Sequence, residues 1–450
     1  MKQASFFETD LPKHPDEANR RNRSNGAMNK LSQEDRAGHD WYRFVLSFPP
    51  HLVSDYIHRF KLNHNHRILD PFCGTGTTLV EAKKRGIASV GIEANPMAHF
   101  ASRVKTDWSV DPEALLKHAS QVFSDASGEL KSLGIFDEPL LRVLNTDNCT
   151  LRSLTSEKEK LLLKDSISPL PLHKALVLLD HLQRWTESPF ERHEKLAFAK
   201  VVLYSASNLR FGPEVGVGTI RRDAPVLKLW LDEVKAMATD LRVLSCLADV
   251  PAEVFHADSR SLTHLLEPAS IDAVITSPPY PNEKDYTRTT RLESVLLGFI
   301  KTKEDLRALK QTLVRSNTRS VYKGDDDDQW ITEHGEIQAI ADRIENRRIE
   351  LGKTSGFERL YARVTKLYFG GMARHLADLR TVLRPGAHLA YVVGDQASYL
   401  RVMIRTGELL ADIAKSLGYE LIGIDLFRTR LSTATREQLR EEVVVLRWPG

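Results

Sequence analysis

The sequence predicts an α/β fold, because short apolar runs alternate with helical patterns over residues 40–107 and again after residue 253. From residue 67 the chain reads as strand, glycine turn, helix, strand and helix. Another apolar run, residues 271–275, ends at two prolines, which cannot continue a central strand. In an open α/β sheet, ligands bind at the carboxyl ends of the strands, so the residues directly after these runs form the candidate site.

The size and composition are those of an ordinary globular protein. With 450 residues, 42% of them hydrophobic, the chain can bury a large core and form more than one domain. It contains no apolar stretch of membrane-spanning length and no N-terminal signal region, so we expect a soluble, cytoplasmic protein without a membrane partner. The three cysteines, Cys73, Cys149 and Cys246, lack paired or metal-like spacing, which fits a reducing compartment. A net charge of +3 does not by itself establish a nucleic-acid partner.

Residues 1–38 are polar and show no helical or strand periodicity, so we expect a flexible N-terminal arm.

The first candidate binding element is residues 67–82, Arg-Ile-Leu-Asp-Pro-Phe-Cys-Gly-Thr-Gly-Thr-Thr-Leu-Val-Glu-Ala. Gly74 and Gly76 let the backbone approach a ligand where a Cβ would intrude, and the helix after them offers unpaired N–H groups.

The next strand ends in Glu93, an acid about 20 positions after the glycine turn, which suits a ribose diol in a nucleotide-type site. A nicotinamide cofactor is the natural competitor for such a turn. The third glycine of the G-x-G-x-x-G pattern is absent, however, because Thr78 and Leu79 continue the helix.

Residues 109–250 are predicted to form a mainly helical insertion. Runs rich in Ala, Leu and Lys predict helices at 113–133, 170–187, 191–209 and 225–248. The stretch from Asn208 to Arg222 holds glycine, arginine and aromatic residues, and we expect a loop there. It either contacts phosphates or simply connects two helices.

The second candidate element is Thr276-Ser277-Pro278-Pro279-Tyr280, at the end of the strand at 271–275. Pro278 and Pro279 end the strand and stiffen the segment, since Pro279 also restricts the backbone of Pro278. The result is a rigid hook with one hydroxyl, free carbonyls and one aromatic face, suited to gripping a planar base through an amine. Taken alone, the segment could equally be a proline turn that closes a strand.

A second insert is predicted at 283–358, and the residues just beyond the hook, Tyr286, Arg288 and Arg291, are candidates for contact with the substrate. The acidic run from Asp325 to Asp328 is most simply a solvated loop, with a cation site as the lesser alternative.

The remaining expected elements are a helix at 357–383 stopped by Arg384-Pro385-Gly386, strands at 387–393 and 419–425, a helix at 405–417 and a last strand at 443–446.

Together, DPFCGTGTT and TSPPY closely resemble motifs of the amino-methyltransferases that use S-adenosylmethionine on nucleic acids, the cytosine-N4 and adenine-N6 DNA methylases. The resemblance implies a doubly wound, Rossmann-like methyltransferase sheet with a reversed last hairpin, divided here between residues 39–108 and 251–450. The cofactor-binding residues that it implies are Asp70, Pro71, Phe72, Gly74, Thr75, Gly76, Glu93, Asp258 and Ser259. The catalytic residues that it implies are Ser277, Pro278, Pro279 and Tyr280.

Within this set the resemblance assigns Glu93 to the ribose and Asp258 to the adenine amine of the cofactor, and it implies no metal. A looser match, from Trp41-Tyr42-Arg43-Phe44 to Val53, resembles the segment that closes over the methionine end. The expected partner is double-stranded DNA, which the N-terminal arm could help to hold, and a cognate restriction or defence protein is a further candidate. The helical insertion precedes Asp258, a departure from the family pattern, so it is a candidate target-recognition region but the second insert could serve instead.

The expected reaction is methyl transfer to an exocyclic amine of a flipped-out base. Such an amine is a poor nucleophile because its lone pair is delocalised into the ring. The Ser277 hydroxyl and the Pro278 carbonyl can accept its N–H groups, while Tyr280 stacks on the base. Serine at position 277 favours cytosine N4, because Ser-Pro-Pro-Tyr accompanies cytosine in the resembling family.

Three alternatives stay open. Adenine N6 is the first, since aspartate and serine can both accept a hydrogen bond. An RNA methyltransferase of the tRNA guanine-N2 type shares both motifs, but its usual N-terminal RNA-binding domain does not fit in the short segment before the fold. A non-catalytic DNA-binding subunit that kept the fold is the third, and the intact motifs count against it.

Overall fold

The computed structural model describes residues 31, 35–43, 47–138, 150–212, 214–282, 284–431 and 438–450. Most of the predicted arm at 1–38 lies outside the described residues, as do Phe44, Cys149, Pro213 and Glu283. Within the described ranges, no helix combines the length and the apolar character that crossing a bilayer requires.

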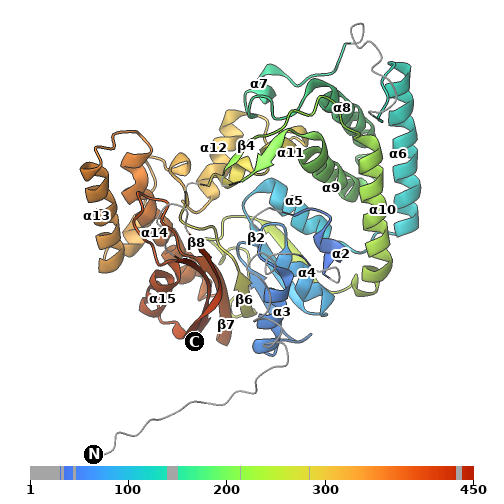
Figure 1. Ribbon diagram of the computed structural model, residues 1–450. Coiled ribbons are helices and arrows are strands. Elements are labelled where there is room, and N and C mark those ends of the chain that lie inside the picture. Colours follow the sequence, from blue (N-terminus) through green and yellow to red (C-terminus); the bar gives the residue numbers. More distant parts are fainter. Residues whose placement is uncertain are drawn as a thin grey trace, which may run out of the picture.

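A seven-stranded sheet forms the centre of the molecule (Figure 1). Its strands, in spatial order, are β5 (Ala252–His256), β2 (Ala88–Glu93), β1 (Arg67–Asp70), β6 (Ile271–Thr276), β7 (Leu383–Gly394), β9 (Gln438–Arg447) and β8 (Glu420–Leu431). Strand β9 is antiparallel to both of its neighbours, and all other pairs are parallel. This order confirms the predicted doubly wound sheet with a reversed last hairpin.

The strand order reverses between β1 and β6, which pair in parallel through Ile68 with Ala273 and Leu69 with Val274. From β1 the chain moves outward to β2 and β5, whereas from β6 it moves to β7 on the other side. Ligands of open α/β sheets bind at such a switch point, because the loops after the two central strands diverge there. The glycine turn and the proline hook are these two loops.

Helices cover both faces of the sheet, because successive strand residues point to opposite sides. Ile68 and Ile275 pack with α3 (Pro50–Arg59) and α4 (Thr77–Lys84), while Leu69 and Val274 face α14 (Tyr361–Leu379). The same apolar core includes α13 (Gly335–Glu350) and α15 (Thr406–Ser416). Helix α5 (Pro96–Lys105) joins the sheet to the helical part of the molecule.

That helical part is built from α6 (Pro112–Ser132), α8 (Pro169–Gln183), α9 (Glu191–Val201) and α10 (Leu227–Leu244), which lie together at the upper right of Figure 1. Their common core holds the fully buried Trp230, whose indole N–H donates to the Glu194 carbonyl at 2.9 Å. The four predicted helices therefore form. The remaining helices and turns are α2 (Arg36–His39), α7 (Ser156–Glu159), α11 (Arg291–Leu296), α12 (Lys303–Thr312), η2 (Val202–Ala206), η3 (Ser245–Leu247), η4 (Tyr286–Arg288), η5 (Thr318–Ser320), η6 (Asp327–Ile331) and η7 (Glu358–Leu360).

Two predictions about connecting segments are wrong. The expected loop from Asn208 to Arg222 contains an antiparallel hairpin, β3 (Leu209–Phe211) and β4 (Val215–Val217), and its strands are too short to show an alternating pattern. The expected helix stop at Arg384-Pro385-Gly386 instead lies inside β7, after a helix that already ends at Leu379. Gly386, at φ +88°, donates its N–H to the Trp448 carbonyl at 2.7 Å, which holds this irregular strand start.

The prediction of a solvated acidic run is also wrong for two of its members, which are held in ion pairs. Asp327 is 4% exposed and accepts from Arg260 and Arg374, and Asp325 lies 2.7 Å from Arg315. The backbone of Asp327 packs directly on α14, where a Cβ at Gly370 would come within 1.9 Å of its carbonyl oxygen. A glycine at position 370 is therefore required for this close approach.

Substitution of Gly370 tests this contact. We expect Gly370→Ala to lower the free energy of unfolding by about 1–3 kcal/mol, because the methyl group displaces η6 from α14. Gly128→Ala in α6 is the matched control, since no atom lies within 4 Å of the added Cβ, and it should raise stability by about 0.5–1 kcal/mol. Denaturant unfolding of both variants measures the difference, and equal stabilities would contradict the packing described.

Candidate active site

The glycine turn and the proline hook line the same cavity, which has a volume of about 910 Å³. The predicted site residues on its wall are Pro71, Phe72, Gly74, Thr75, Glu93, Ser259, Ser277, Pro278, Pro279 and Tyr280. Asp70, Gly76 and Asp258 do not line the cavity themselves, but each is next in the chain to a residue that does. The structure thus brings together ten of the thirteen predicted positions.

Asp70 connects the glycine turn to the base of the proline hook. Its Oδ1 accepts the hydroxyl of Thr276, the residue before the hook, at 2.6 Å and the N–H of Phe72 at 3.2 Å. Its Oδ2 is buried without a hydrogen-bond partner in the described structure. Burial raises the pKa of Asp70 to about 6, because desolvation disfavours the ionised carboxylate. Asp70 therefore links the glycine turn to the proline hook and keeps one buried acceptor without a donor in the described structure.

The glycine turn packs too tightly for larger residues. Gly76 has φ +83°, and a Cβ there would lie 3.0 Å from the Ser102 side chain. In the neighbouring strand, a Cβ at Gly91 would lie 2.8 Å from the Cys73 sulfur. The buried Cys73 thiol, whose pKa is raised by burial, fills this space, as expected for a neutral packing residue.

Glu93 is oriented by backbone N–H groups. Its Oε2 accepts from Gly74 at 2.9 Å and its Oε1 from Asn95 at 2.7 Å, so the carboxylate is fixed between the glycine turn and α5. Burial raises the pKa of Glu93 to about 7 despite these hydrogen bonds. The carboxyl group lines the cavity, where its remaining lone pairs can accept from a diol.

Asp258 is engaged by its own loop. Both of its oxygens accept from the Arg260 guanidinium, at 2.6 to 3.1 Å, and Oδ1 also accepts the Arg260 N–H. Arg260 in turn reaches the buried Asp327, so the loop is tied to η6. This arrangement leaves Asp258 little capacity to accept from an adenine amine, whereas the adjacent Ser259 lines the cavity.

A buried histidine supports this loop from behind. His375 Nδ1 lies 2.7 Å from the Ser259 carbonyl and its Nε2 lies 2.7 Å from the Tyr391 hydroxyl. A carbonyl can only accept, so Nδ1 carries the proton and Nε2 accepts from Tyr391. Burial lowers the pKa of His375 to about 4, which keeps the ring neutral. The Phe72 ring packs edge-on against the same imidazole, with centroids 4.9 Å apart.

The proline hook is braced by three groups that the motif does not contain. The Ser277 hydroxyl donates to the Val392 carbonyl of β7 at 3.2 Å. The Tyr280 N–H donates to the Tyr286 hydroxyl at 3.3 Å. The Tyr280 ring packs on Gly394, where a Cβ would lie 2.9 Å from the ring. Because its proton is used, the Ser277 oxygen offers lone pairs to the cavity.

Sequence reasoning missed Val392 and Gly394, although the predicted strand at 387–393 ended beside them. Because β7 pairs with β6, the carboxyl end of β7 must lie next to the hook. The strand order was therefore the signal that could have identified these two residues. Of the three contact candidates after the hook, Tyr286 lines the cavity. Arg291 instead donates to the Thr287 and Leu161 carbonyls.

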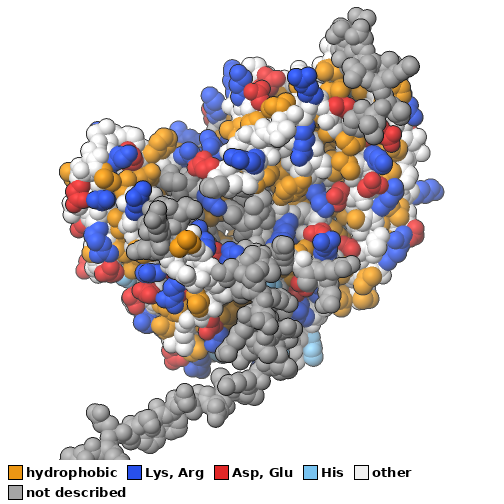
Figure 2. Space-filling view, viewed as in Figure 1, with side chains coloured by type: hydrophobic (Ala, Val, Ile, Leu, Met, Phe, Trp, Pro, Cys, Tyr) orange, Lys and Arg blue, Asp and Glu red, His pale blue; other side chains and the backbone are white. Residues whose placement is uncertain are grey.

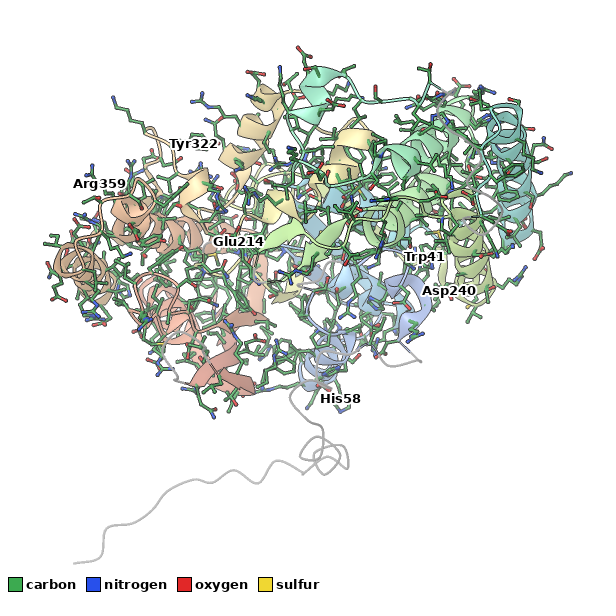
Figure 3. The ribbon with its side chains drawn as sticks, turned by 45° about the horizontal axis from the view of Figure 1, so that its top comes forward. Trp41, His58, Glu214, Asp240, Tyr322 and Arg359 are labelled. Atoms are coloured by element: carbon green, nitrogen blue, oxygen red, sulfur yellow. The ribbon has the colours of Figure 1, made fainter. Side chains whose placement is uncertain are left out.

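The upstream segment divides between two environments. Ser47, Phe48 and Pro49 line the cavity, in agreement with the resemblance. Trp41 and Tyr42 lie in the core of the helical part, where the Trp41 indole N–H donates to Asp240 at 2.8 Å (Figure 3) and Tyr42 donates to Glu293.

Comparisons with known proteins find similarity to methyltransferases. Residues 5–102, which include the glycine turn but not the hook, match a family model described as DNA methylase. Type II methyltransferase M.BsoBI of Geobacillus stearothermophilus is 26% identical over 455 residues, which cover 92% of this chain and 85% of the relative. Type II methyltransferase M.AvaI of Anabaena variabilis is 26% identical over 434 residues, or 91% and 86% of the two chains.

A shorter alignment of 110 residues, at 32% identity, matches 24% of this chain to 20% of Type II methyltransferase M.MjaII of Methanocaldococcus jannaschii. The solved structure of TrmN from Thermus thermophilus aligns with 89% of this chain and 48% of its own, at 10% identity and a TM-score of 0.27, which is too weak a likeness to support a conclusion. The matched family model and the two long alignments confirm the resemblance to the DNA amino-methyltransferases that the motifs carry.

Proposed function

We propose that this protein transfers a methyl group from S-adenosylmethionine to an exocyclic amine of a flipped-out DNA base, with cytosine N4 as the favoured target. The observation that carries the proposal is the shared cavity at the switch point, with Glu93 and the glycine turn on one wall and the Ser277 to Tyr280 hook on another. The Asp70–Thr276 hydrogen bond fixes the spacing between these walls.

The lining residues fit the cofactor chemically. Glu93 can accept from the ribose hydroxyls, Ser259 and Phe72 offer polar and aromatic surface on the cavity wall, and a sulfonium is attracted by aromatic faces and by nearby acids. Asp70 adds a buried oxygen that lacks a donor in the described structure. When bound, the cofactor supplies an electrophilic methyl group on a positively charged sulfur.

The hook is proposed to prepare the amine. The Ser277 oxygen accepts one N–H of the amine, since its own proton goes to Val392, and the Pro278 carbonyl accepts the other. Two acceptors fixed in this way favour a pyramidal nitrogen whose lone pair points at the methyl group. Both are uncharged and already positioned, so little reorganisation is needed during the reaction.

Tyr280 is proposed to hold the base after it leaves the duplex. Its ring lines the cavity and is fixed by Gly394 and by the Tyr286 hydroxyl that binds its N–H. Base flipping costs roughly a few kcal/mol, and stacking on an aromatic ring recovers about 1–3 kcal/mol of it. Methyl transfer would be a direct in-line displacement, in which the amine nitrogen–carbon bond forms as the carbon–sulfur bond breaks and a neutral thioether leaves. The amine proton leaves to solvent after the transfer.

Cytosine N4 is favoured over adenine N6 because the hook begins with serine, as in the cytosine enzymes that it resembles. The names of the long relatives, both Type II methyltransferases, support methyltransferase activity. A duplex DNA substrate and a cognate restriction partner in the cytoplasm are parts of the proposal. An RNA substrate and a non-catalytic subunit are the further candidates that experiment must separate from this proposal. The intact lining of the cavity supports a catalytic role.

Analysis of the modified base tests the target directly. DNA from cells that express the protein is digested to nucleosides and examined by mass spectrometry, with tRNA from the same cells as the second sample. We expect N4-methylcytosine in the DNA. N6-methyladenine in the DNA would instead identify adenine as the target. Methylated guanine in the tRNA would identify RNA, rather than DNA, as the substrate.

Two substitutions in the hook separate binding from catalysis. We expect Ser277→Ala and Tyr280→Ala to lower the methylation rate by roughly 10²-fold or more, because each removes a group that holds the amine or the base. Cofactor affinity, measured by calorimetry, should change little. Glu93→Gln is the matched comparison, and its main effect should be weaker cofactor binding. Equal losses of binding and rate in the hook variants would contradict the assigned roles.

Cofactor binding should depend on pH through Glu93. Its folded pKa of about 7 lies above the usual 4.5, so its contribution to stability is complete below pH 4.5 and is lost as the pH rises through 7. Cofactor binding should have the opposite pH dependence, because the sulfonium cation and the ribose diol require the ionised Glu93 carboxylate. We expect affinity to fall roughly tenfold from pH 8 to pH 6, and Glu93→Gln to flatten the profile. Calorimetric titrations at several pH values measure this, and a profile that Glu93→Gln leaves unchanged would exclude Glu93 as the cause.

A further inference from the structure

One carboxylate at the mouth of the cavity joins three separate segments of the chain. Glu214, in the turn of the β3–β4 hairpin, lies 3.4 Å from Arg288 of η4 and 3.2 Å from Arg319 of η5. Figure 3 shows Glu214 near the middle of the molecule, at the hairpin that the helical part contributes. Glu214 itself is one of the lining residues of the cavity.

These two arginines differ from Arg260, Arg315 and Arg428. Arg260 and Arg315 are 7% and 4% exposed and are held by Asp327 and Asp325, and Arg428 forms a bidentate pair with Glu441 at 2.6 and 2.9 Å. Arg288 and Arg319 instead share one carboxylate whose side chain is 45% exposed, and they are themselves 31% and 28% exposed. Exposed ion pairs of this kind are weak, so another anion can exchange with Glu214.

The geometry of the pair suits a tetrahedral oxyanion. The Nη1 atom of Arg319 approaches both Glu214 oxygens, at 3.2 and 3.3 Å, and Arg288 approaches one of them at 3.4 Å. A phosphate oxygen pair can replace a carboxylate in this arrangement, since guanidinium groups bind both. The Arg319 guanidinium also lies over the Phe357 ring, 5.7 Å from its centroid, which limits its freedom.

The position of the pair relates it to the reacting base. The neighbours Thr289 and Ser320 line the same cavity as Tyr280 and Tyr286, so the arginines lie at its rim. A strand that delivers a flipped base to the hook must pass its backbone across this rim. Elsewhere on the face shown in Figure 2, basic and acidic side chains are intermixed, so a local pair of arginines matters more than a general positive field.

We propose that Arg288 and Arg319 together bind a backbone phosphate next to the flipped nucleotide, and that Glu214 occupies this site until DNA displaces it. The inference rests on the proposed function, because it takes DNA as the substrate. It assigns the hairpin of the helical part a role in admitting the strand. It also explains why an acid lies at the entrance of a site for a polyanion.

Salt-dependent DNA binding tests the proposal. The probes are a duplex that carries the sequence methylated by the wild-type enzyme and an unrelated duplex of equal length. We expect the double variant Arg288→Gln/Arg319→Gln to weaken binding to both duplexes and to reduce the slope of log Kd against log salt by about 0.9, the value for one lost phosphate contact. Glu214→Gln should tighten binding by about two- to fivefold, because a weak competing pair is removed.

Matched controls come from α13, where Arg343 and Glu336 form an exposed pair at 3.1 Å remote from the cavity. Arg343→Gln and Glu336→Gln should leave Kd and the salt slope unchanged. Cofactor affinity, measured by calorimetry, should be unchanged in every variant and confirms that each is folded. Arg288→Lys and Arg319→Lys retain the charge and should keep the wild-type slope.

The outcomes are separable. A double variant with the wild-type salt slope, or a Glu214→Gln variant that binds DNA more weakly than wild type, would overturn the phosphate assignment while leaving the methyltransferase proposal intact. A wild-type protein that neither binds nor methylates duplex DNA would instead overturn the proposed function. An increased affinity for free inorganic phosphate in Glu214→Gln, without a change in DNA binding, would assign the pair to a small anion and refute the DNA contact.

Discussion

The parallel pairing of β1 with β6 is the constraint on which the site depends. It places the carboxyl ends of two strands, some 200 positions apart in the chain, side by side at one edge of the sheet. The central groups of the cavity are positioned relative to this pair: the glycine turn after β1, the hook after β6, Glu93 at the end of β2 and Val392 near the end of β7. The Asp70–Thr276 hydrogen bond adds a direct link across the pair where the strands end.

Two desolvated acids, one on the cavity wall and one beneath it, carry an energetic cost. Asp70 keeps one buried oxygen without a partner in the described structure, and the acids at positions 70 and 93 have raised pKa values because burial disfavours their charge. Structures tolerate such groups mainly at functional sites, where a ligand supplies the missing donors or positive charge. The His375–Tyr391 pair behind the Ser259 loop is neutral, and both imidazole nitrogens are hydrogen-bonded.

The motifs themselves were predictable because each is local: a strand, a turn and a few residues carry all of the signal. The reversed strand order came from family resemblance, since short apolar runs alone do not say which strands are neighbours. Asp258 illustrates what was not predictable, because its pairing with Arg260 is completed by Asp327 from a distant turn without periodic pattern. The same holds for the acidic run, since a cluster of charges is usually solvated and only tertiary contacts show that the Asp325 and Asp327 side chains are enclosed.

The β3–β4 hairpin belongs by sequence to the helical part, yet Phe211, Gly212 and Glu214 form part of the cavity wall. The sheet alone is therefore not a minimal catalyst. Excision of residues 109–250 would remove one side of the chamber and would also uncover Trp41 and Tyr42, which are buried among the excised helices. Any attempt to shorten this protein, or to graft a foreign recognition module in place of its helices, must retain the hairpin and a replacement cover for these two aromatic rings.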